Sequence, residues 1–161
     1  MRVKICGIQT LDEAMAVIDA GADALGFHVE LEHAKNPIGS ATLNAIISRL
    51  PPFVSTVVVT TETDPKKLSR IARATGANTL QLHGDIEPDA VRAVKALMFY
   101  LKIYVAVHAG SDAYEKAKSF GDSADAILLD SPKSETGARG GSGKTHDWTA
   151  SREIVDSLSL M

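Results

Sequence analysis

The chain has 161 residues, of which 45% are hydrophobic and 23% charged, a composition ordinary for one globular domain with its own core. Its net charge of −3 argues against non-specific nucleic-acid binding, which requires a basic face. Because it has a single cysteine, no apolar run long enough to span a bilayer and no apolar N-terminal stretch of signal-peptide length, we expect a cytoplasmic protein with no membrane or nucleic-acid partner.

Short β-rich runs alternate with segments of helical periodicity along the chain. The predicted strands are residues 2–6, 23–28, 54–60, 78–83, 101–108 and 125–130. Three apolar stripes with helical spacing lie between them: Leu11, Ala14, Met15 and Ile18; Leu43, Ile46, Ile47 and Leu50; and Val91, Val94 and Leu97. Helix starts are indicated by the capping-box pair Thr10 and Glu13, by Asp64-Pro65 and by Pro88. Strands that alternate with helices imply a parallel sheet with crossover helices.

The polar and apolar residues within the strands favour one parallel architecture over the other. An open sheet covered by helices on both sides should be apolar on both faces, whereas only the outer face of a barrel meets helices. Strand 78–83 places Thr79, Gln81 and His83 on one face and Leu80 and Leu82 on the other. The predicted fold class is therefore α/β, of the (β/α)8 TIM-barrel type.

The length of the chain bears on how much of such a barrel it contains. Typical barrels need about 250 residues. Our count reaches a sixth strand and its helix, near residues 148–157, and the tail at 158–161 is where a seventh strand would begin. We therefore expect residues 1–161 to form a single partial barrel domain, truncated after about six βα units.

Titratable side chains gather at the ends of the predicted strands. The last residues of the six strands are Cys6, His28, Thr60, His83, His108 and Asp130. Catalytic groups of (β/α)8 enzymes lie at the carboxyl ends of the strands. The alternation of faces directs Cys6, His83 and Asp130 inward. We therefore predict a functional mouth at which a thiol, three imidazoles and a carboxylate converge.

A thiol and a carboxylate across such a mouth suit isomerisation by proton transfer. Cys6 would act as a thiolate base, with its pKa lowered by Lys4 two residues earlier on the same face. Asp130 would protonate a leaving oxygen if burial raised the pKa of its carboxyl. The alternative for Cys6 is a small buried core residue, the usual fate of a free cysteine.

Several motifs resemble one family of sugar-phosphate isomerases. They include Lys4-Ile5-Cys6-Gly7-Ile8, Gln81-Leu82-His83-Gly84-Asp85, Leu129-Asp130-Ser131 and Gly140-Gly141-Ser142-Gly143-Lys144-Thr145-His146-Asp147-Trp148. In this order they are similar to the phosphoribosylanthranilate isomerases of tryptophan biosynthesis, and the resemblance covers the whole chain.

The resemblance implies a cofactor-free Amadori rearrangement of phosphoribosylanthranilate to a 1-amino-2-ketose phosphate. It gives Asp130 the role of general acid on the furanose ring oxygen, and Cys6 that of the base that removes the C2′ proton. It also implies that Lys4, His83, Gly140, Gly141, Ser142 and Gly143 bind the sugar-phosphate substrate, and that the site uses no metal.

Two departures from the family qualify these expectations. Many members carry an arginine for the anthranilate carboxylate where this chain has Ile38, with Lys35 nearby, and an isoleucine makes no charge-assisted bond. The exact substrate therefore stays open. The family binds phosphate largely through loops after the seventh and eighth strands, so we expect weak or no isomerase activity from the isolated chain. Its protein partner would be a second copy in a homodimer or a complementing C-terminal segment.

Parts of the sequence are compatible with three other functions. Residues 138–145 match a permissive phosphate-loop pattern, but the pattern does not directly follow a strand as nucleotide binding requires. Zinc would accept His28, His83 and His108, or the nearby group His28, Glu30 and His33, although nothing in their spacing demands a metal. The third alternative is a catalytically impaired paralogue or barrel fragment.

Overall fold

The structure, a computed structural model, describes residues 1–31, 37–131 and 148–157. Strands and helices alternate strictly over these residues. The strands are β1 (Lys4–Cys6), β2 (Ala24–His28), β3 (Ser55–Thr60), β4 (Thr79–Leu82), β5 (Lys102–His108) and β6 (Ala126–Asp130). The helices are α1 (Leu11–Asp19), α2 (Ser40–Ile47), α3 (Pro65–Thr75), α4 (Pro88–Leu97), α5 (Ala113–Ser119) and α6 (Trp148–Ser157). The six predicted βα units are confirmed.

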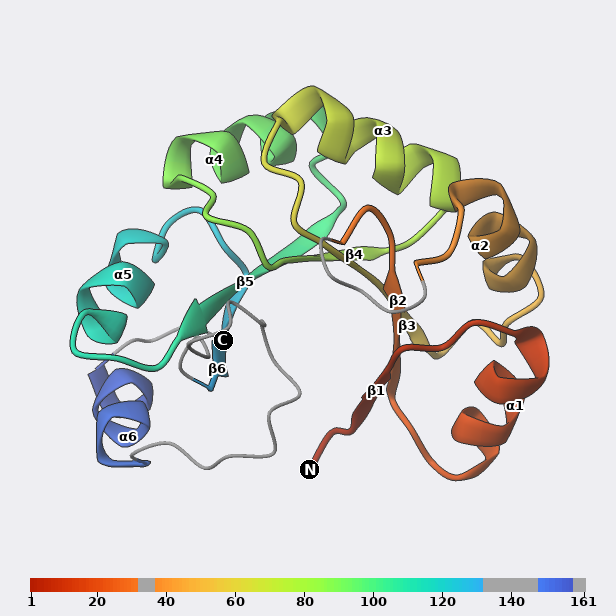
Figure 1. Ribbon diagram of the computed structural model, residues 1–161, viewed down its shortest axis with the longest axis horizontal. Helices are drawn as coiled ribbons and strands as arrows, with labels where there is room; N and C mark the ends of the chain where they lie inside the picture. The colour runs from red at the N-terminus through yellow and green to blue at the C-terminus, as the bar shows by residue number, and fades with distance from the viewer. Residues whose placement is uncertain (32–36, 132–147, 158–161) are drawn as a thin grey trace.

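The strands form one curved parallel sheet in chain order, from β1 to β6. The helices cover its convex side, and the concave side faces the centre of an open half-barrel (Figure 1). This arrangement confirms the predicted α/β fold of barrel type. Parallel strands all end at the same edge, so the carboxyl ends of β1 and β6 lie at one mouth.

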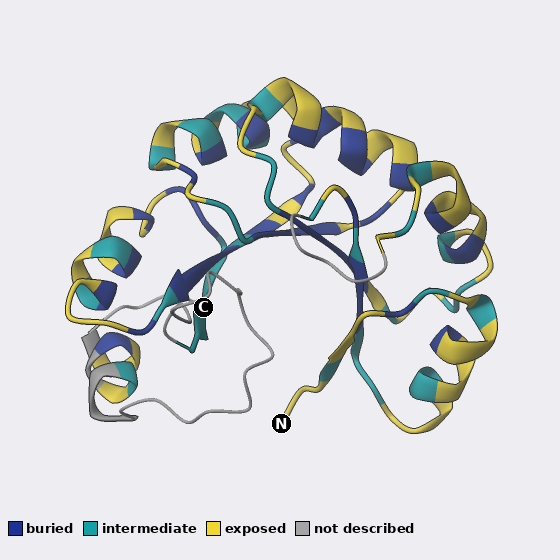
Figure 2. Cartoon of the chain, viewed as in Figure 1, coloured by how far each residue is buried: buried dark blue, intermediate teal, exposed yellow. Residues whose placement is uncertain are grey.

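The alternation of faces is also confirmed. The outward residues of the inner strands, among them Leu25, Phe27, Leu80 and Ile103, are fully buried beneath the helices, whereas those of the edge strands β1 and β6 are less covered (Figure 2). The inward residues are more polar, because no helix packs against them. Residue register aligns Cys6 with Gly26 and His108 with Asp130. The apolar core therefore lies between the sheet and the helices, and the inner face carries the chemical groups.

Local sequence explains where the helices begin. Thr10 and Glu13 form the predicted capping box of α1. Asp64 caps α3 by accepting a hydrogen bond from the Lys67 backbone N–H at 2.9 Å, and Pro65 follows it at the first helical position. Pro88 likewise takes the first helical position of α4, although Glu87 before it makes no side-chain cap bond. Among the described residues, no helix is long and apolar enough to cross a membrane.

The predicted apolar stripes differ from the structure at three positions. Met15 is 37% exposed because the smaller Ala14 takes the fully buried position of α1. Leu97 is 50% exposed at the last position of α4. Leu50 packs against the core from beyond the end of α2. A stripe of apolar residues predicts which side of a helix is buried, but it does not predict how far along the helix neighbouring elements cover that side.

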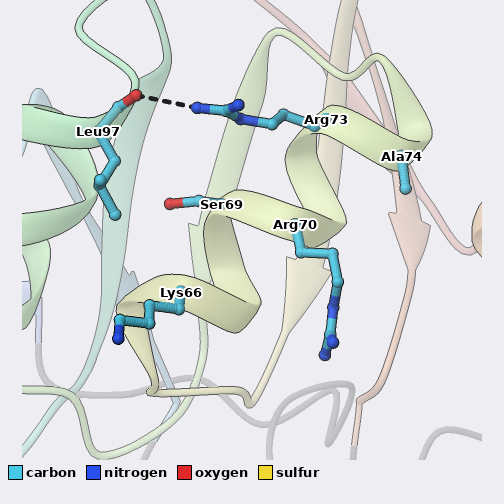
Figure 3. Close-up of a pocket in the computed structure, with 6 residues that line it drawn as sticks. All are labelled: Lys66, Ser69, Arg70, Arg73, Ala74 and Leu97. Carbon is cyan, nitrogen blue, oxygen red and sulfur yellow. Dashed lines mark hydrogen bonds between the residues drawn. The ribbon is translucent and has the colours of Figure 1, made fainter.

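A cavity of about 550 Å³ lies between α3 and α4 (Figure 3). It is lined by Lys66, Ser69, Arg70, Arg73, Ala74 and Leu97. Arg73 spans the two helices by donating a hydrogen bond to the Leu97 carbonyl oxygen at 3.4 Å. Because both helices pack on the convex side of the sheet, this groove is separated from the inward-facing groups at the mouth.

Candidate active site

The first group of candidate functional side chains surrounds Cys6 at the end of β1. The sulfur lies 3.4 Å from Lys4 Nζ and 3.5 Å from His28 Nε2. Gly26, the neighbour of Cys6 in β2, leaves room for it: a Cβ atom there would stand 2.5 Å from Sγ. Cys6 is exposed on the inner face. The alternative of a buried core cysteine is therefore wrong.

The surroundings of Cys6 favour the thiolate. Partial burial raises the pKa of the thiol, but the hydrogen bond with His28 and the positive charge of Lys4 outweigh that effect, and the pKa of Cys6 lies below its ordinary value. The predicted effect of Lys4 is therefore confirmed. Sequence reasoning placed His28 among the strand-end residues but did not pair it with Cys6.

Lys4 is held in place from the opposite direction by β4. Its Nζ donates a hydrogen bond to Gln81 Oε1 at 2.9 Å, and Gln81 is only 3% exposed. A polar residue in the middle of a strand was the available signal for this contact, since buried amides are nearly always hydrogen-bonded. The bond ties β1 to β4 across the concave face and directs the ammonium group towards the sulfur.

The second group surrounds Asp130 at the end of β6. His83 Nε2 lies 3.1 Å from Asp130 Oδ2, and His108 Nδ1 lies 3.8 Å from the same oxygen. The other carboxylate oxygen accepts a hydrogen bond from the Ser131 backbone N–H at 2.8 Å. The rings of His83 and His108 are 5.7 Å apart. The predicted imidazoles therefore divide between the two groups: His28 joins Cys6, and the other two join Asp130.

The condition set for Asp130 as a general acid, that burial raises the pKa of its carboxyl, is not met in the free protein. The hydrogen bond from His83 has the largest effect on the carboxyl and lowers its pKa; partial burial acts in the opposite direction, and the Ser131 N–H and the two imidazoles lower it further. The pKa of Asp130 therefore lies below its ordinary value, and the carboxylate is ionised at neutral pH. The sequence indicated the burial of Asp130 but not its hydrogen-bond donors.

The second group has the dimensions of a metal site. The ligand atoms of His83, His108 and Asp130 lie within 4.8 Å of one another, whereas the predicted zinc set included His28 instead of Asp130. The hydrogen bonds favour a proton network. His108 Nδ1 lies 3.1 Å from the Ser131 carbonyl oxygen, which can only accept, so that nitrogen carries a proton. A metal bound through His108 Nδ1 and His83 Nε2 would have to displace this proton and the one that His83 shares with Asp130.

Tyr104 lies on the inner face of β5, in register with Gln81. Burial raises the pKa of its hydroxyl, and the negative charge of Cys6 raises it further, so the group stays protonated at neutral pH. Sequence reasoning did not select Tyr104. Its position in the middle of an apolar strand was a weak signal, because tyrosines are common in ordinary strands.

The remaining predicted residues lie next to the segments that the structure does not describe, or within them. Ile38, at the position of the expected arginine, packs against the core and donates its backbone N–H to the His28 carbonyl oxygen at 2.8 Å. Lys35, His33 and the glycine-rich segment of Gly140, Gly141, Ser142 and Gly143 lie outside the described residues, as do the phosphate-loop pattern and the tail at 158–161.

The family of N-(5′-phosphoribosyl)anthranilate isomerases matches residues 3–160 of this chain. The isomerase of Methanocella arvoryzae is 37% identical over 160 residues, which are 99% of this chain and 74% of that protein. The chain belongs to the phosphoribosylanthranilate isomerase family. It is an isomerase of tryptophan biosynthesis, as its motifs indicated.

Solved structures of phosphoribosylanthranilate isomerases agree with the fold. The enzyme of Thermotoga maritima matches with a TM-score of 0.83 and 34% identity, over 97% of this chain and 72% of the other. A further isomerase, 29% identical with a TM-score of 0.78 over 97% of this chain and 71% of its own, was solved with reduced 1-(o-carboxyphenylamino)-1-deoxyribulose 5-phosphate.

Proposed function

We propose that Asp130 and Cys6 divide the acid–base chemistry of phosphoribosylanthranilate isomerisation. The observation that carries the proposal is their placement. A thiol beside two nitrogen donors and a carboxylate held by imidazole lie at the carboxyl ends of β1 and β6, on the same inward face of one curved sheet.

In the first step Asp130 acts as the general acid. It gives a proton to the furanose ring oxygen of the substrate while the C1′–O bond breaks, and the anilino nitrogen supplies the electron pair that forms an iminium at C1′. The positive charge of the iminium acidifies the proton on C2′. General acid catalysis of this kind contributes about 10²- to 10⁴-fold in rate.

In the second step Cys6 acts as the base. The thiolate takes the C2′ proton, and the electron pair of that C–H bond forms the C1′=C2′ double bond of an enolamine. The enolamine tautomerises to the 1-amino-2-ketose. The lowered pKa of Cys6 supports this role, because the thiolate rather than the thiol is the reactive form.

The ionised state of Asp130 requires that it gain a proton when substrate binds. A sugar phosphate brings negative charge to the mouth and excludes water from it, and both effects raise the pKa of a neighbouring carboxyl. His83 already donates a hydrogen bond to Asp130, so a proton is at hand on the same oxygen. His83 thereby sets the protonation of the acid as well as lining the substrate site.

The phosphate and carboxylate groups of the substrate are both anionic, so we look for groups at the site that bind anions. Lys4 supplies a positive charge on the inner face beside Cys6. The glycine-rich segment 140–143 is proposed to bind substrate, as the motif implies. The relative solved with a reduced 1-(o-carboxyphenylamino)-1-deoxyribulose 5-phosphate supports a ligand that carries both groups.

The test follows the loss of phosphoribosylanthranilate fluorescence with this chain and with a form extended through a seventh and an eighth strand, and Cys6→Ala and Asp130→Asn are made in the extended form. We expect each variant to lose at least about 100-fold in kcat, because each removes a proton-transfer group. Asp122→Asn is the matched control: it makes the same change at an exposed carboxyl in the loop before β6 and should leave turnover intact.

Turnover that survives in Cys6→Ala would remove Cys6 from the mechanism. Turnover that survives in Asp130→Asn would remove Asp130 from it. Binding of the reduced product analogue, measured separately by calorimetry, distinguishes a loss of chemistry from a loss of binding. Normal binding with no turnover in both variants supports the proposal.

A further inference from the structure

We propose that His28 is a positioning residue for Cys6, which holds the sulfur as a thiolate towards the substrate and returns it to that state after each turnover. The inference rests on the proposed role of Cys6 as the base. It adds a residue from β2 to a pair of catalytic groups that come from β1 and β6.

The geometry follows from the pairing of β1 with β2. Cys6 is in register with Gly26, and His28 lies two residues further along β2 on the same face. Since Gly26 has no side chain, the sulfur occupies the space above it and comes within 3.5 Å of His28 Nε2. The His28 ring also lies 3.9 Å from the place where a Cβ of Gly7 would be, so the turn after β1 borders it.

The two nitrogen groups beside the sulfur are suited to different tasks. Lys4 Nζ is closer to Gln81 Oε1, at 2.9 Å, than to the sulfur, at 3.4 Å. It is therefore a tethered positive charge that is shared between two acceptors. His28 presents one ring nitrogen, Nε2, to Sγ. An imidazole can gain and lose a proton near neutral pH, whereas an ammonium group cannot.

This difference gives His28 a task in the catalytic cycle. When Cys6 has taken the C2′ proton it is a neutral thiol and must lose that proton before the next turnover. The ring first exchanges its proton with solvent, so that Nδ1 carries it and Nε2 is free to accept. The proton of Sγ then passes to Nε2, which leaves a thiolate beside an imidazolium. The half-buried ring releases the Nδ1 proton to solvent, which restores the Nε2–H that faces the thiolate. The thiolate is thereby restored without outside reagents.

The experiment uses the fact that Cys6 is the only cysteine of the chain, so iodoacetamide labels one site. Alkylation is measured across pH in the unaltered chain, in His28→Phe, which keeps a ring without a donor, and in His28→Gln, which keeps a donor without proton exchange. In His28→Phe we expect the alkylation profile to move to higher pH, with kcat/KM below neutral pH reduced about tenfold. His28→Gln should shift the alkylation profile less than His28→Phe does, because it keeps a donor. It should recover a smaller share of the lost kcat, because glutamine cannot exchange the proton.

His108→Phe is the matched control, because it makes the same change in the group around Asp130. It should leave the alkylation profile of Cys6 in place. Thermal unfolding of each variant verifies folding, and should His28→Phe be unfolded, the His28→Gln profile decides. Alkylation profiles that coincide with that of the unaltered chain would overturn the role of His28.

Failure of this inference is separable from failure of the proposed function. If Cys6→Ala retains turnover, Cys6 is not the base, whatever His28 does. If Cys6→Ala is inactive and the His28 variants alkylate and turn over as the unaltered chain does, Cys6 keeps its role and His28 has none.

Discussion

At the scale of single residues, a glycine without a side chain is as important to the site as the charged residues. Gly26 leaves the space that the Cys6 sulfur fills, and a Cβ there would also stand 3.1 Å from Lys4 Nζ. A strand glycine that lets another group approach closely is a recognised use of this residue. The position of the thiol relative to both of its neighbours therefore depends on a residue that makes no bond to it.

Gly26→Ala should displace the sulfur and weaken both of its contacts. We expect a loss of about 1–3 kcal/mol in the free energy of unfolding from overpacking, with kcat/KM reduced at least about tenfold. Chemical denaturation and steady-state kinetics measure the two effects. Gly39→Ala is the control, because nothing lies within 4 Å of a Cβ at that position. Equal effects of the two changes would contradict the steric argument.

The lowered pKa of Cys6 predicts a pH dependence. In the proposed mechanism the thiolate is the active form, so kcat/KM should fall as pH drops through the pKa of Cys6 in the free enzyme, which lies below the ordinary thiol value. Lys4→Met removes a positive charge 3.4 Å from the sulfur, so the fall should begin at a higher pH. The pH profile of kcat/KM tests this, and a profile that Lys4→Met leaves in place would exclude an electrostatic role for Lys4.

At the scale of elements, helix starts determine how the chain leaves the mouth of the barrel. Asp64 caps α3 with a side-chain hydrogen bond, whereas Glu87, at the same position before α4, makes none. Both are followed by a proline at the first helical position. The two helices therefore form a matched pair in which only one cap contributes a bond.

Asp64→Ala should lower the free energy of unfolding by about 1 kcal/mol, the usual value of an N-cap. Glu87→Ala should change it by less than about 0.5 kcal/mol, because no cap bond is lost. Urea denaturation of both variants provides the comparison. A cost for Glu87→Ala as large as that for Asp64→Ala would mean that the side-chain bond is not what stabilises the start of α3.

At the scale of the whole molecule, carboxylates that join distant segments make stability depend on pH. Asp125, before β6, accepts the Ile103 backbone N–H at 2.8 Å and forms ion pairs with Lys95 at 2.9 Å and Lys102 at 3.3 Å. Burial raises the pKa of its carboxyl, but these three donors outweigh burial, and the pKa lies below its ordinary value. The loop before β6 is thereby attached to α4 and β5.

The sign of the resulting pH dependence follows from linkage. A carboxyl whose pKa is lower in the folded state stabilises the fold fully above its unfolded pKa, about 3.9, and loses that contribution as pH falls through the folded value. Asp125→Asn should cost about 1–2 kcal/mol at neutral pH. It should also make the free energy of unfolding fall less steeply in acid. Urea denaturation at a series of pH values checks both, and unchanged steepness would contradict the linkage.

The edges of the sheet lead to a prediction about assembly. Among the described strands, β1 and β6 each pair on one side, and Val3 and Ile5 near the β1 edge are 39% and 40% exposed. Such edges favour pairing with further strands. The chain spans 74% of its Methanocella arvoryzae relative. We expect the remaining part of that relative, added as a separate polypeptide, to raise turnover of phosphoribosylanthranilate, and no increase at saturating concentration would exclude such complementation.

Much of the fold was predictable from local patterns. Each strand lies within one residue of its prediction at its carboxyl end, because apolar alternation and the following turn residues mark that end clearly. The amino end of β1, at Lys4 rather than residue 2, was less certain because sheet edges fray. The carboxyl ends matter most here, since they carry Cys6, His28, His108 and Asp130.

The partners of the site residues were less predictable. Lys4 and Cys6 share a face two residues apart in one strand, so their contact follows from strand geometry alone. The contacts of His28 with Cys6, Gln81 with Lys4 and His83 with Asp130 join residues 22, 77 and 47 positions apart. Such contacts depend on strand order, register and curvature, which no single strand contains.

The sequence by itself determined that the chain forms βα units, that one face of each strand is polar and that Cys6 and Asp130 stand at strand ends, because periodicity and turn chemistry act over a few residues. Only the tertiary structure decided the protonation of these groups. Burial alone would have raised the pKa of both Cys6 and Asp130, yet hydrogen bonds with His28 and His83, which are distant in the sequence, help to lower each of them. The strength of such bonds depends on distances of a few ångströms, which exist only once the sheet has curved.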